Sequence, residues 1–232
     1  MYQKIALPYV RLRTLSNSSV LFAPSFTRAI FVRHPLERLA SAYIDKIGTV
    51  RAEPLALYDS LRQTICRKYA SYYLTVTQQH VHFIKRFFPK DTYQPCQKVI
   101  PIFEHFVEYI MSHASQTDVH WQPYSTLCSV CRLNYNFIGK YETIQEDLNA
   151  LKFKFGLNFT HWHSYRQFSS GKTKENYKLM YSKLPNHLLC HLRTFYSEDL
   201  KFFDYRFEDY LPDHQQINCT TQHYRRFNAF LY

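Results

Sequence analysis

A segment near the N-terminus combines an arginine, a hydroxyl and an expected helix start. The apolar run Ala29–Val32 precedes Arg33 and Pro35, and proline suits the first turn of a helix. Arg38 and Ser41 lie three residues apart, so they share one face of that helix. Because guanidinium groups, hydroxyls and helix N-termini all bind phosphate, the segment predicts a phosphate site. A solvated arginine before an ordinary polar helix start is the plainer interpretation of the same spacing.

A histidine further along the chain is the candidate for a general base. His120 stands in the run Asp118-x-His120-Trp121, where Asp118 could orient the ring or tune its charge. Histidine suits proton transfer because its pKa lies near neutrality. His34 and His163 are the other candidates, and most of the 12 histidines must be structural or lie at the surface. A structural His120 that caps a turn against Trp121 explains the pattern equally well.

The overall composition is that of a basic, aromatic-rich globular protein. The 232 residues carry 29 Lys and Arg against 18 Asp and Glu, a formal charge of +11, and 46% of them are hydrophobic. This apolar content excludes disorder, and only four glycines exclude collagen-like and linker classes. The basic surplus indicates an anionic partner or, equally, a solvated basic face. No apolar run is long enough for a membrane span.

Hydrophobic periodicity predicts strands separated by helices, which is typical of an α/β fold. A first, parallel strand is expected at Ala29–Val32, and a second at residues 133–139, where apolar and polar positions alternate. Residues 70–100 are expected to be mainly loop. The expected helices run from Pro35 to Gly48, around residues 55–69, from Pro101 through Met111, from a capping box at Thr143–Glu146 to Gly156, and from Pro185 to Tyr196.

Cysteines and glycosylation sequons both favour an oxidising, luminal compartment. Sequons stand at Asn17, Asn158 and Asn218. Cys128 and Cys131 form a CxxC without the second pair that a structural zinc site needs, so no metal is expected. Six cysteines allow many pairings, and the sequence does not choose among them. We expect these two to form disulfides with other cysteines, with a direct bond between them as the alternative.

Several blocks, in order, resemble the Golgi carbohydrate sulfotransferases. The pattern R-x-P-x-x-R-x-x-S-x-Y, which starts at Arg33 after the apolar run, is similar to the 3′-phosphate-binding segment of that family. The later blocks resemble the chondroitin, dermatan and HNK-1 branch, and the likeness extends from Arg28 to Cys219. These blocks are Phe103-x-x-Phe106-Val107, Asp118-x-His120-Trp121-x-Pro123, Leu127-Cys128-x-x-Cys131, the run from Tyr135 to Asp147, and the run from Tyr196 to Tyr205.

The resemblance implies a carbohydrate sulfotransferase with a P-loop-NTPase-like α/β fold, a central parallel sheet flanked by helices. The implied co-substrate is 3′-phosphoadenosine 5′-phosphosulfate, and the acceptor is a hydroxyl of a glycosaminoglycan or glycoprotein glycan, acidic or neutral. Arg33, Arg38 and Ser41 are the implied ligands of the 3′-phosphate. Arg38 has an alternative role, an ion pair with Glu37 or Glu142. The implied location is the Golgi lumen or membrane, and the oligomeric state is left open.

One family element is not found in the chain. No residues before Arg33 match the PKxxCTNWK-type loop that holds the 5′-phosphosulfate, and no membrane anchor is found either. We therefore expect an incomplete sulfotransferase domain over residues 26–212, between an irregular leader at 1–25 and a tail at 213–232, with little sulfate transfer by the chain alone. The alternative is an inactive, nucleotide- or glycan-binding remnant. Nucleic-acid binding is not expected, because the basic residues are dispersed and no zinc-finger or RNP-type motif is found.

Overall fold

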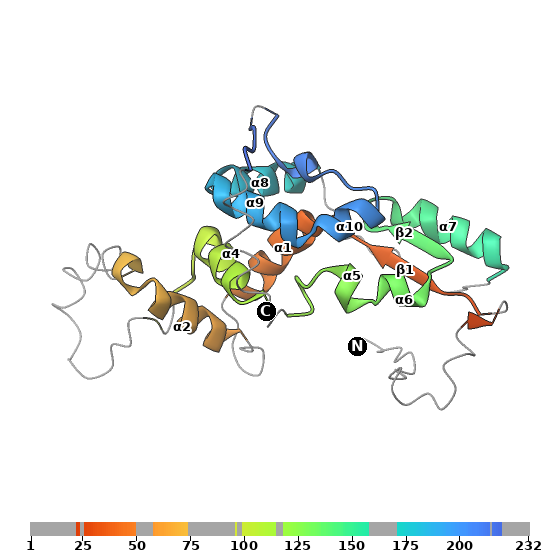
Figure 1. Cartoon of the computed structure of the whole chain (residues 1–232), viewed down its shortest axis with the longest axis horizontal. Coiled ribbons are helices and arrows are strands. Elements are labelled where there is room, and N and C mark those ends of the chain that lie inside the picture. The colour runs from red at the N-terminus through yellow and green to blue at the C-terminus, as the bar shows by residue number, and fades with distance from the viewer. Residues whose placement is uncertain are drawn as a thin grey trace. The chain divides into compact units, whose positions relative to one another are not determined.

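The computed structural model of this chain describes residues 22–23, 26–49, 58–73, 96, 99–114, 118–157, 171–213 and 215–219 (Figure 1). These residues belong to two compact units. We call them the strand unit, which comprises Met1–Val32 and Tyr124–Ser164, and the helical unit, which comprises Arg33–Pro123 and Tyr165–Tyr232. The expected single domain over 26–212 stays a prediction.

Three of the residues singled out in the sequence lie outside the described residues. These are His163 and the sequons at Asn17 and Asn158. The third sequon asparagine, Asn218, is described and exposed.

The strand unit contains two parallel strands, as the apolar run at Ala29–Val32 predicted. Strand β1 (Ala29–Val32) pairs with β2 (Phe137–Lys140), in a register that sets Ala29 opposite Phe137 and Val32 opposite Lys140. Helix α7 (Ile144–Phe155) follows β2 and packs against it (Figure 1). The unit is therefore α/β, with a small parallel sheet.

The second strand starts later than the alternating pattern predicted. Residues 133–136 are not strand, because the short helix α6 (Val130–Leu133) ends there. Ser129 and Asn134 bracket α6 with φ values of 48° and 44°, a left-handed conformation that asparagine tolerates. The Tyr135 hydroxyl donates to the Cys128 carbonyl at 2.9 Å and so folds back towards the preceding short helix, α5 (Tyr124–Leu127). Local turn geometry outweighs the alternation here.

The start of α7 also differs from the expected capping box. Thr143 makes no side-chain bond to the helix backbone; its hydroxyl donates to Asp147 Oδ2 at 2.8 Å. The same oxygen accepts the Lys140 backbone N–H at 2.6 Å, so Asp147 ties the end of β2 to the first turn of α7. The predicted end of the helix is confirmed, since Gly156 has a φ of 61° and donates to the Lys152 carbonyl.

The helical unit is built around α1 (Pro35–Ala42), which continues as a π-helical turn at Tyr43–Ile47 and ends at Gly48 as predicted. In this unit the structure confirms the three other predicted helices, and residues 70–73 are helical where loop was expected. Among the described residues of this unit, two helices, α8 and α10, were not predicted. The further elements are α2 (Asp59–Lys68), α4 (Phe103–Ser112), α8 (Gly171–Ser182), α9 (Asn186–Phe195), α10 (Ser197–Phe202) and a 3₁₀ turn, η6 (Phe207–Tyr210).

The core of the helical unit surrounds α1. Leu36 and Leu39 are fully buried, together with aromatic side chains from other helices such as Phe106 and Tyr181. The Tyr181 hydroxyl donates to the Leu36 carbonyl at 2.6 Å, because a buried hydroxyl needs a partner. Along the described part of the chain, no helix combines the length and apolar character that crossing a bilayer requires.

Two disulfides crosslink the helical unit, and they differ from the expected pairing. Cys66 is bonded to Cys96, and Cys190 in α9 is bonded to Cys219. The expected bridges from Cys128 and Cys131 to other cysteines are therefore wrong, because the four other cysteines are already bonded to each other. No disulfide joins Cys128 to Cys131 either, and Cys131 is exposed.

Candidate active site

A buried histidine caps the N-terminus of α1. His34 Nδ1 accepts the Leu36 backbone N–H at 3.2 Å, and Nε2 donates to the Arg206 carbonyl at 2.9 Å. The ring lies against Tyr205 and Tyr210, with ring centroids 4.9 and 4.4 Å away. Burial lowers the pKa of His34 to about 4, so the ring is neutral near pH 7. Since both nitrogens are engaged, the geometry favours a structural role for His34 over that of a base.

A buried carboxylate holds Arg33 beside the start of α1. Glu37, whose side chain is 1% exposed, accepts Arg33 Nη2 at 2.6 Å and also accepts the Tyr210 hydroxyl. The Arg33 side chain keeps 20% of its surface exposed. A guanidinium carries five donors in one plane, so Arg33 can bind a carboxylate and a phosphate together. Sequence reasoning missed Tyr210 because it lies far from Glu37 along the chain.

The other two predicted phosphate ligands lie further along α1. Ser41 is partly exposed and lies one helical turn after Glu37, the partner of Arg33. The Ser41 hydroxyl and the Glu37 carboxylate therefore share one face of α1. Arg38 is 9% exposed, and its Nη2 donates to the Gln122 carbonyl. Burial raises the pKa of Tyr196, while a hydrogen bond from Arg38 acts in the opposite direction. Arg38 therefore connects α1 to the loop that carries His120.

The loop at residues 118–123 is anchored from two sides. The Trp121 side chain is buried and meets the Phe106 ring edge-on at 5.3 Å. The Trp121 carbonyl accepts the Tyr196 hydroxyl at 2.6 Å, next to the Gln122 carbonyl that Arg38 holds. Two neighbouring carbonyls of the loop are thus fixed by side chains from α1 and from the end of α9. This anchoring sets the place of His120, which directly precedes Trp121.

Asp118 and His120 form a close pair at the surface of this loop. His120 Nδ1 lies 2.5 Å from Asp118 Oδ1, and the same oxygen accepts the His120 backbone N–H at 2.9 Å. The His120 side chain is 40% exposed and that of Asp118 33%. A carboxylate that holds Nδ1 orients the ring and leaves Nε2 for proton transfer. The structure thus brings together the two residues that the run Asp118-x-His120-Trp121 singled out.

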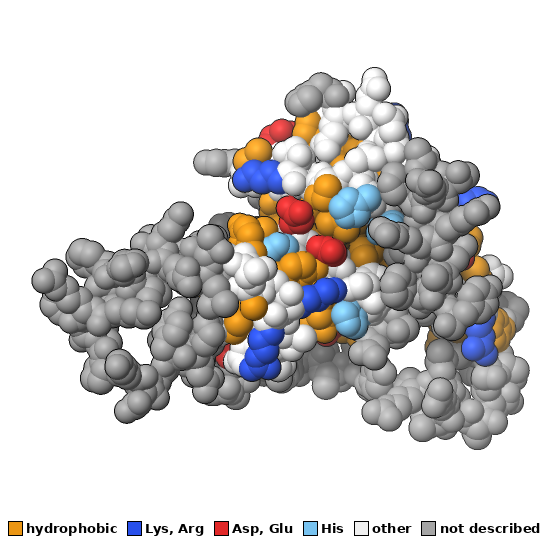
Figure 2. Space-filling view, turned by 60° about the vertical axis from the view of Figure 1, so that its left-hand side comes forward, with side chains coloured by type: hydrophobic (Ala, Val, Ile, Leu, Met, Phe, Trp, Pro, Cys, Tyr) orange, Lys and Arg blue, Asp and Glu red, His pale blue; other side chains and the backbone are white. Residues whose placement is uncertain are grey.

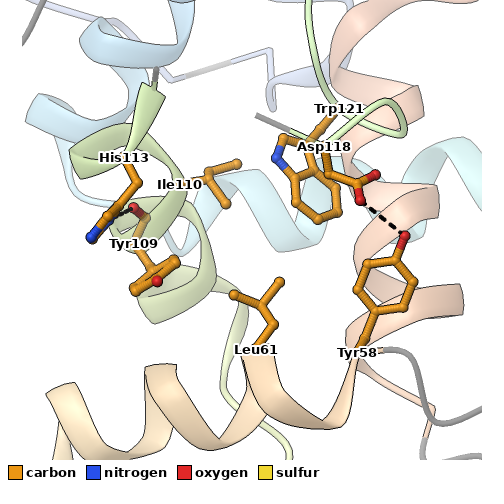
Figure 3. Close-up of a pocket in the computed structure, with 7 residues that line it drawn as sticks. All are labelled: Tyr58, Leu61, Tyr109, Ile110, His113, Asp118 and Trp121. Carbon is orange, nitrogen blue, oxygen red and sulfur yellow. Dashed lines mark hydrogen bonds between the residues drawn. The ribbon is translucent and has the colours of Figure 1, made fainter. Parts of the chain in front are cut away.

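A cavity lies beside this pair. It has a volume of about 300 Å³ and is bordered by α2, α4 and the loop (Figure 3). Asp118 lines it, and a dashed line in Figure 3 marks the bond that Asp118 Oδ2 accepts from the Tyr58 hydroxyl at 3.2 Å. Across the cavity, the Tyr109 ring stacks on His113 with centroids 4.2 Å apart. The lining residues are Tyr58, Leu61, Tyr109, Ile110, His113, Asp118 and Trp121.

One face of the described residues is mixed in charge. Figure 2 shows Lys and Arg side chains that lie apart from each other on this face, with acidic, histidine and hydrophobic side chains between them. Among the residues that the structure describes, no three His, Cys, Asp or Glu side chains come together as metal ligands would.

Comparison with known proteins identifies the family. A model of the sulfotransferase family matches residues 9–206, most of the chain. The chain belongs to the sulfotransferase family. No solved structure matches it significantly.

Curated relatives of this family member are carbohydrate sulfotransferases. It is 28% identical to carbohydrate sulfotransferase 9 of Homo sapiens over 195 residues, 78% of this chain and 38% of that protein. It is 26% identical to carbohydrate sulfotransferase 11 of Rattus norvegicus over 193 residues, 81% of this chain and 49% of that protein. A third relative, carbohydrate sulfotransferase 12 of Xenopus laevis, is 28% identical over 78% of this chain and 40% of its own length. The chain thus spans less than half the length of these relatives.

Proposed function

We propose that this chain belongs to an enzyme that transfers a sulfuryl group from 3′-phosphoadenosine 5′-phosphosulfate to a sugar hydroxyl of a glycosaminoglycan or glycoprotein glycan. Membership of the sulfotransferase family supports the reaction class. The observation that carries the proposal is the Asp118–His120 pair, 2.5 Å apart with the imidazole 40% exposed. A surface imidazole held by a carboxylate suits the removal of a proton from a sugar hydroxyl.

The residues at the start of α1 fit the 3′-phosphate of this donor. Arg33 is partly exposed and is held in one orientation by Glu37. Ser41, one helical turn after Glu37, adds a hydroxyl. The backbone N–H groups at the N-terminus of α1 add favourable partial charge. We assign Arg33 and Ser41 as phosphate ligands. Arg38 is a third ligand. Because its Nη2 also donates to the Gln122 carbonyl, it would connect the bound phosphate to the loop at residues 118–123.

His120 acts on the acceptor in this proposal. The bound donor supplies an activated sulfuryl group on its 5′-phosphate. His120 accepts the proton of the sugar hydroxyl at Nε2, while an oxygen–sulfur bond forms and the bond between sulfur and the 5′-phosphate oxygen breaks. Asp118 stabilises the imidazolium that results, as a carboxylate beside a histidine does. Positioning and charge stabilisation then supply most of the rate enhancement.

The proposed location is the Golgi lumen. Two disulfides and the exposed asparagine of the sequon at Asn218 support an oxidising compartment with glycosylation. The proposed partner is a glycan acceptor, and the formal charge of +11 supports one that is acidic or lies near acidic chains.

Two measurements on the full chain test the proposal. For the donor site, calorimetry with 3′-phosphoadenosine 5′-phosphate should show about tenfold weaker binding to Arg33→Lys, because lysine keeps the charge but loses the planar set of donors. The control is Arg193→Lys, an exposed arginine of α9, which should bind as the parent does. Equal affinity of Arg33→Lys and the parent would refute the assignment.

For the reaction, labelled sulfate transfer to desulfated chondroitin and dermatan is measured with a family phosphosulfate-loop segment joined upstream, and it should fall by about 100-fold or more in His120→Ala. The exposed His187 provides the control variant, His187→Ala. The same assay without that segment measures how much of the activity needs the loop. Nucleotide binding without any transfer, in both versions, would overturn the enzyme proposal in favour of a binding protein.

A further inference from the structure

Tyr58 lies where the cavity, Asp118 and His120 meet. It directly precedes α2, and its hydroxyl is 3.2 Å from Asp118 Oδ2 and 2.9 Å from His120 Nδ1. No sequence pattern singled it out, because it stands some 60 residues before its partners. Figure 3 shows its side chain pointing from the start of α2 towards the Asp118 carboxylate.

The distances favour one arrangement of protons in this cluster. Burial and the Asp118 charge raise the pKa of Tyr58 to about 12, so its hydroxyl is protonated at neutral pH. If Tyr58 donated to Nδ1, two acceptors, Nδ1 and Asp118 Oδ1, would face each other at 2.5 Å. The repulsion is removed when Nδ1–H donates to Asp118 Oδ1 and the Tyr58 hydroxyl donates to Oδ2. The Tyr58 oxygen then serves as a second acceptor for Nδ1–H, and the lone pair resides on Nε2.

We propose that Tyr58 is a positioning residue that holds Asp118 and His120 in the tautomer and orientation needed for proton transfer at Nε2. The inference rests on the proposed function, in which His120 is the base. Tyr58 acts on both members of the pair: it fixes the carboxylate oxygen that His120 does not use, and it contacts the imidazole nitrogen itself.

The surroundings of Tyr58 make it a firm support. Its ring lies 6.2 Å from the buried Trp121 ring and meets the His120 ring edge-on at 6.0 Å. The first turn of α2 is held in turn by Arg62, which pairs with Asp59 and donates to the Lys46 carbonyl at 2.8 Å. These contacts connect the start of α2 to the π-helical turn that follows α1. Because Tyr58 is held by these contacts, its hydrogen bonds can fix the orientation of the partly exposed His120.

Tyr58→Phe is the direct test, because it removes the hydroxyl and keeps the ring that packs on Trp121. We expect kcat for sulfate transfer to fall about tenfold, while KM for donor and glycan changes less than twofold. Nitrogen-15 NMR of the imidazole should show a smaller Nδ1–H population at His120 in the variant. The control is Tyr72→Phe, which removes the hydroxyl of an exposed tyrosine outside the candidate site and should leave both readouts unchanged.

The two readouts separate this inference from the proposed function. An unchanged tautomer and unchanged kcat in Tyr58→Phe, with the parent active, would overturn the role of Tyr58. A changed tautomer in a chain that transfers no sulfate would support the contact while refuting the proposed reaction. Thermal unfolding of both variants should match the parent within a few degrees, and a large loss of stability confined to Tyr58→Phe would assign the tyrosine a structural role instead.

Discussion

The two halves of the candidate site are held in different ways. At the start of α1, ionisable side chains are buried in the core: Glu37 is 1% exposed, and His34 is 2% exposed. In the loop at residues 118–123, Asp118 and His120 remain at the surface, and buried side chains hold the backbone of the loop. In the proposed function, the first arrangement would preform the anion site, and its loss should also destabilise the fold. In the second, the orientation of the proposed base depends on a few hydrogen bonds.

We expect the largest effect on stability when the buried arrangement at the start of α1 is disrupted at Glu37. Glu37→Ala removes a carboxylate that accepts from both Arg33 and the Tyr210 hydroxyl, so a partly buried charge and a buried hydroxyl each lose one bond. Breaking a buried pair costs about 3–5 kcal/mol, and we expect about 3 because Arg33 is 20% exposed. Urea unfolding measures this loss. Glu198→Ala, at an exposed glutamate of α10, should change the free energy of unfolding by under about 0.5 kcal/mol.

A pH dependence follows from His34 in the same region. Its pKa falls from 6.5 in the unfolded chain to about 4 in the folded one, so the unfolded state binds more protons between these values. Stability is therefore full above about pH 6.5 and falls as the pH drops towards 4, by about 3 kcal/mol from this residue. His34→Asn keeps a helix-capping side chain but does not titrate. Its unfolding free energy should decline less steeply over this window, and parallel curves for parent and variant would contradict the prediction.

A smaller effect is expected where the loop is anchored. Tyr196→Phe leaves the Trp121 carbonyl without its 2.6 Å partner and should cost about 1–3 kcal/mol. Amide hydrogen exchange locates the change: the Trp121 and Gln122 amides, which donate to the Asp118 carbonyl, should exchange faster. The Arg38 amide in α1, which donates to the His34 carbonyl, serves as the internal reference. Uniform acceleration at all three amides would show that the loop and α1 respond as one element.

The sequence predicted correctly those elements whose structure depends on residues that are neighbours along the chain. The run Ala29–Val32 is a parallel strand because it is apolar and is followed at once by a helix start. Gly156 ends α7 because it adopts a positive φ at low cost. The second strand could not be placed as well, since the left-handed Asn134 shifts its start to Phe137. Helix α8 was missed because its sequence is largely polar, with few buried side chains such as Tyr177 and Tyr181.

By itself, the sequence determined which residue types the site would contain and which of them lie close along the chain. The strip from Arg33 to Ser41 follows from helical periodicity, and the Asp118–His120 contact spans two residues. Only the tertiary structure decided which distant groups meet: Glu37 with Tyr210, and His120 with Tyr58. The physical reason is that such contacts arise when the core packs α1, α2 and η6 together, and no spacing within one element records them.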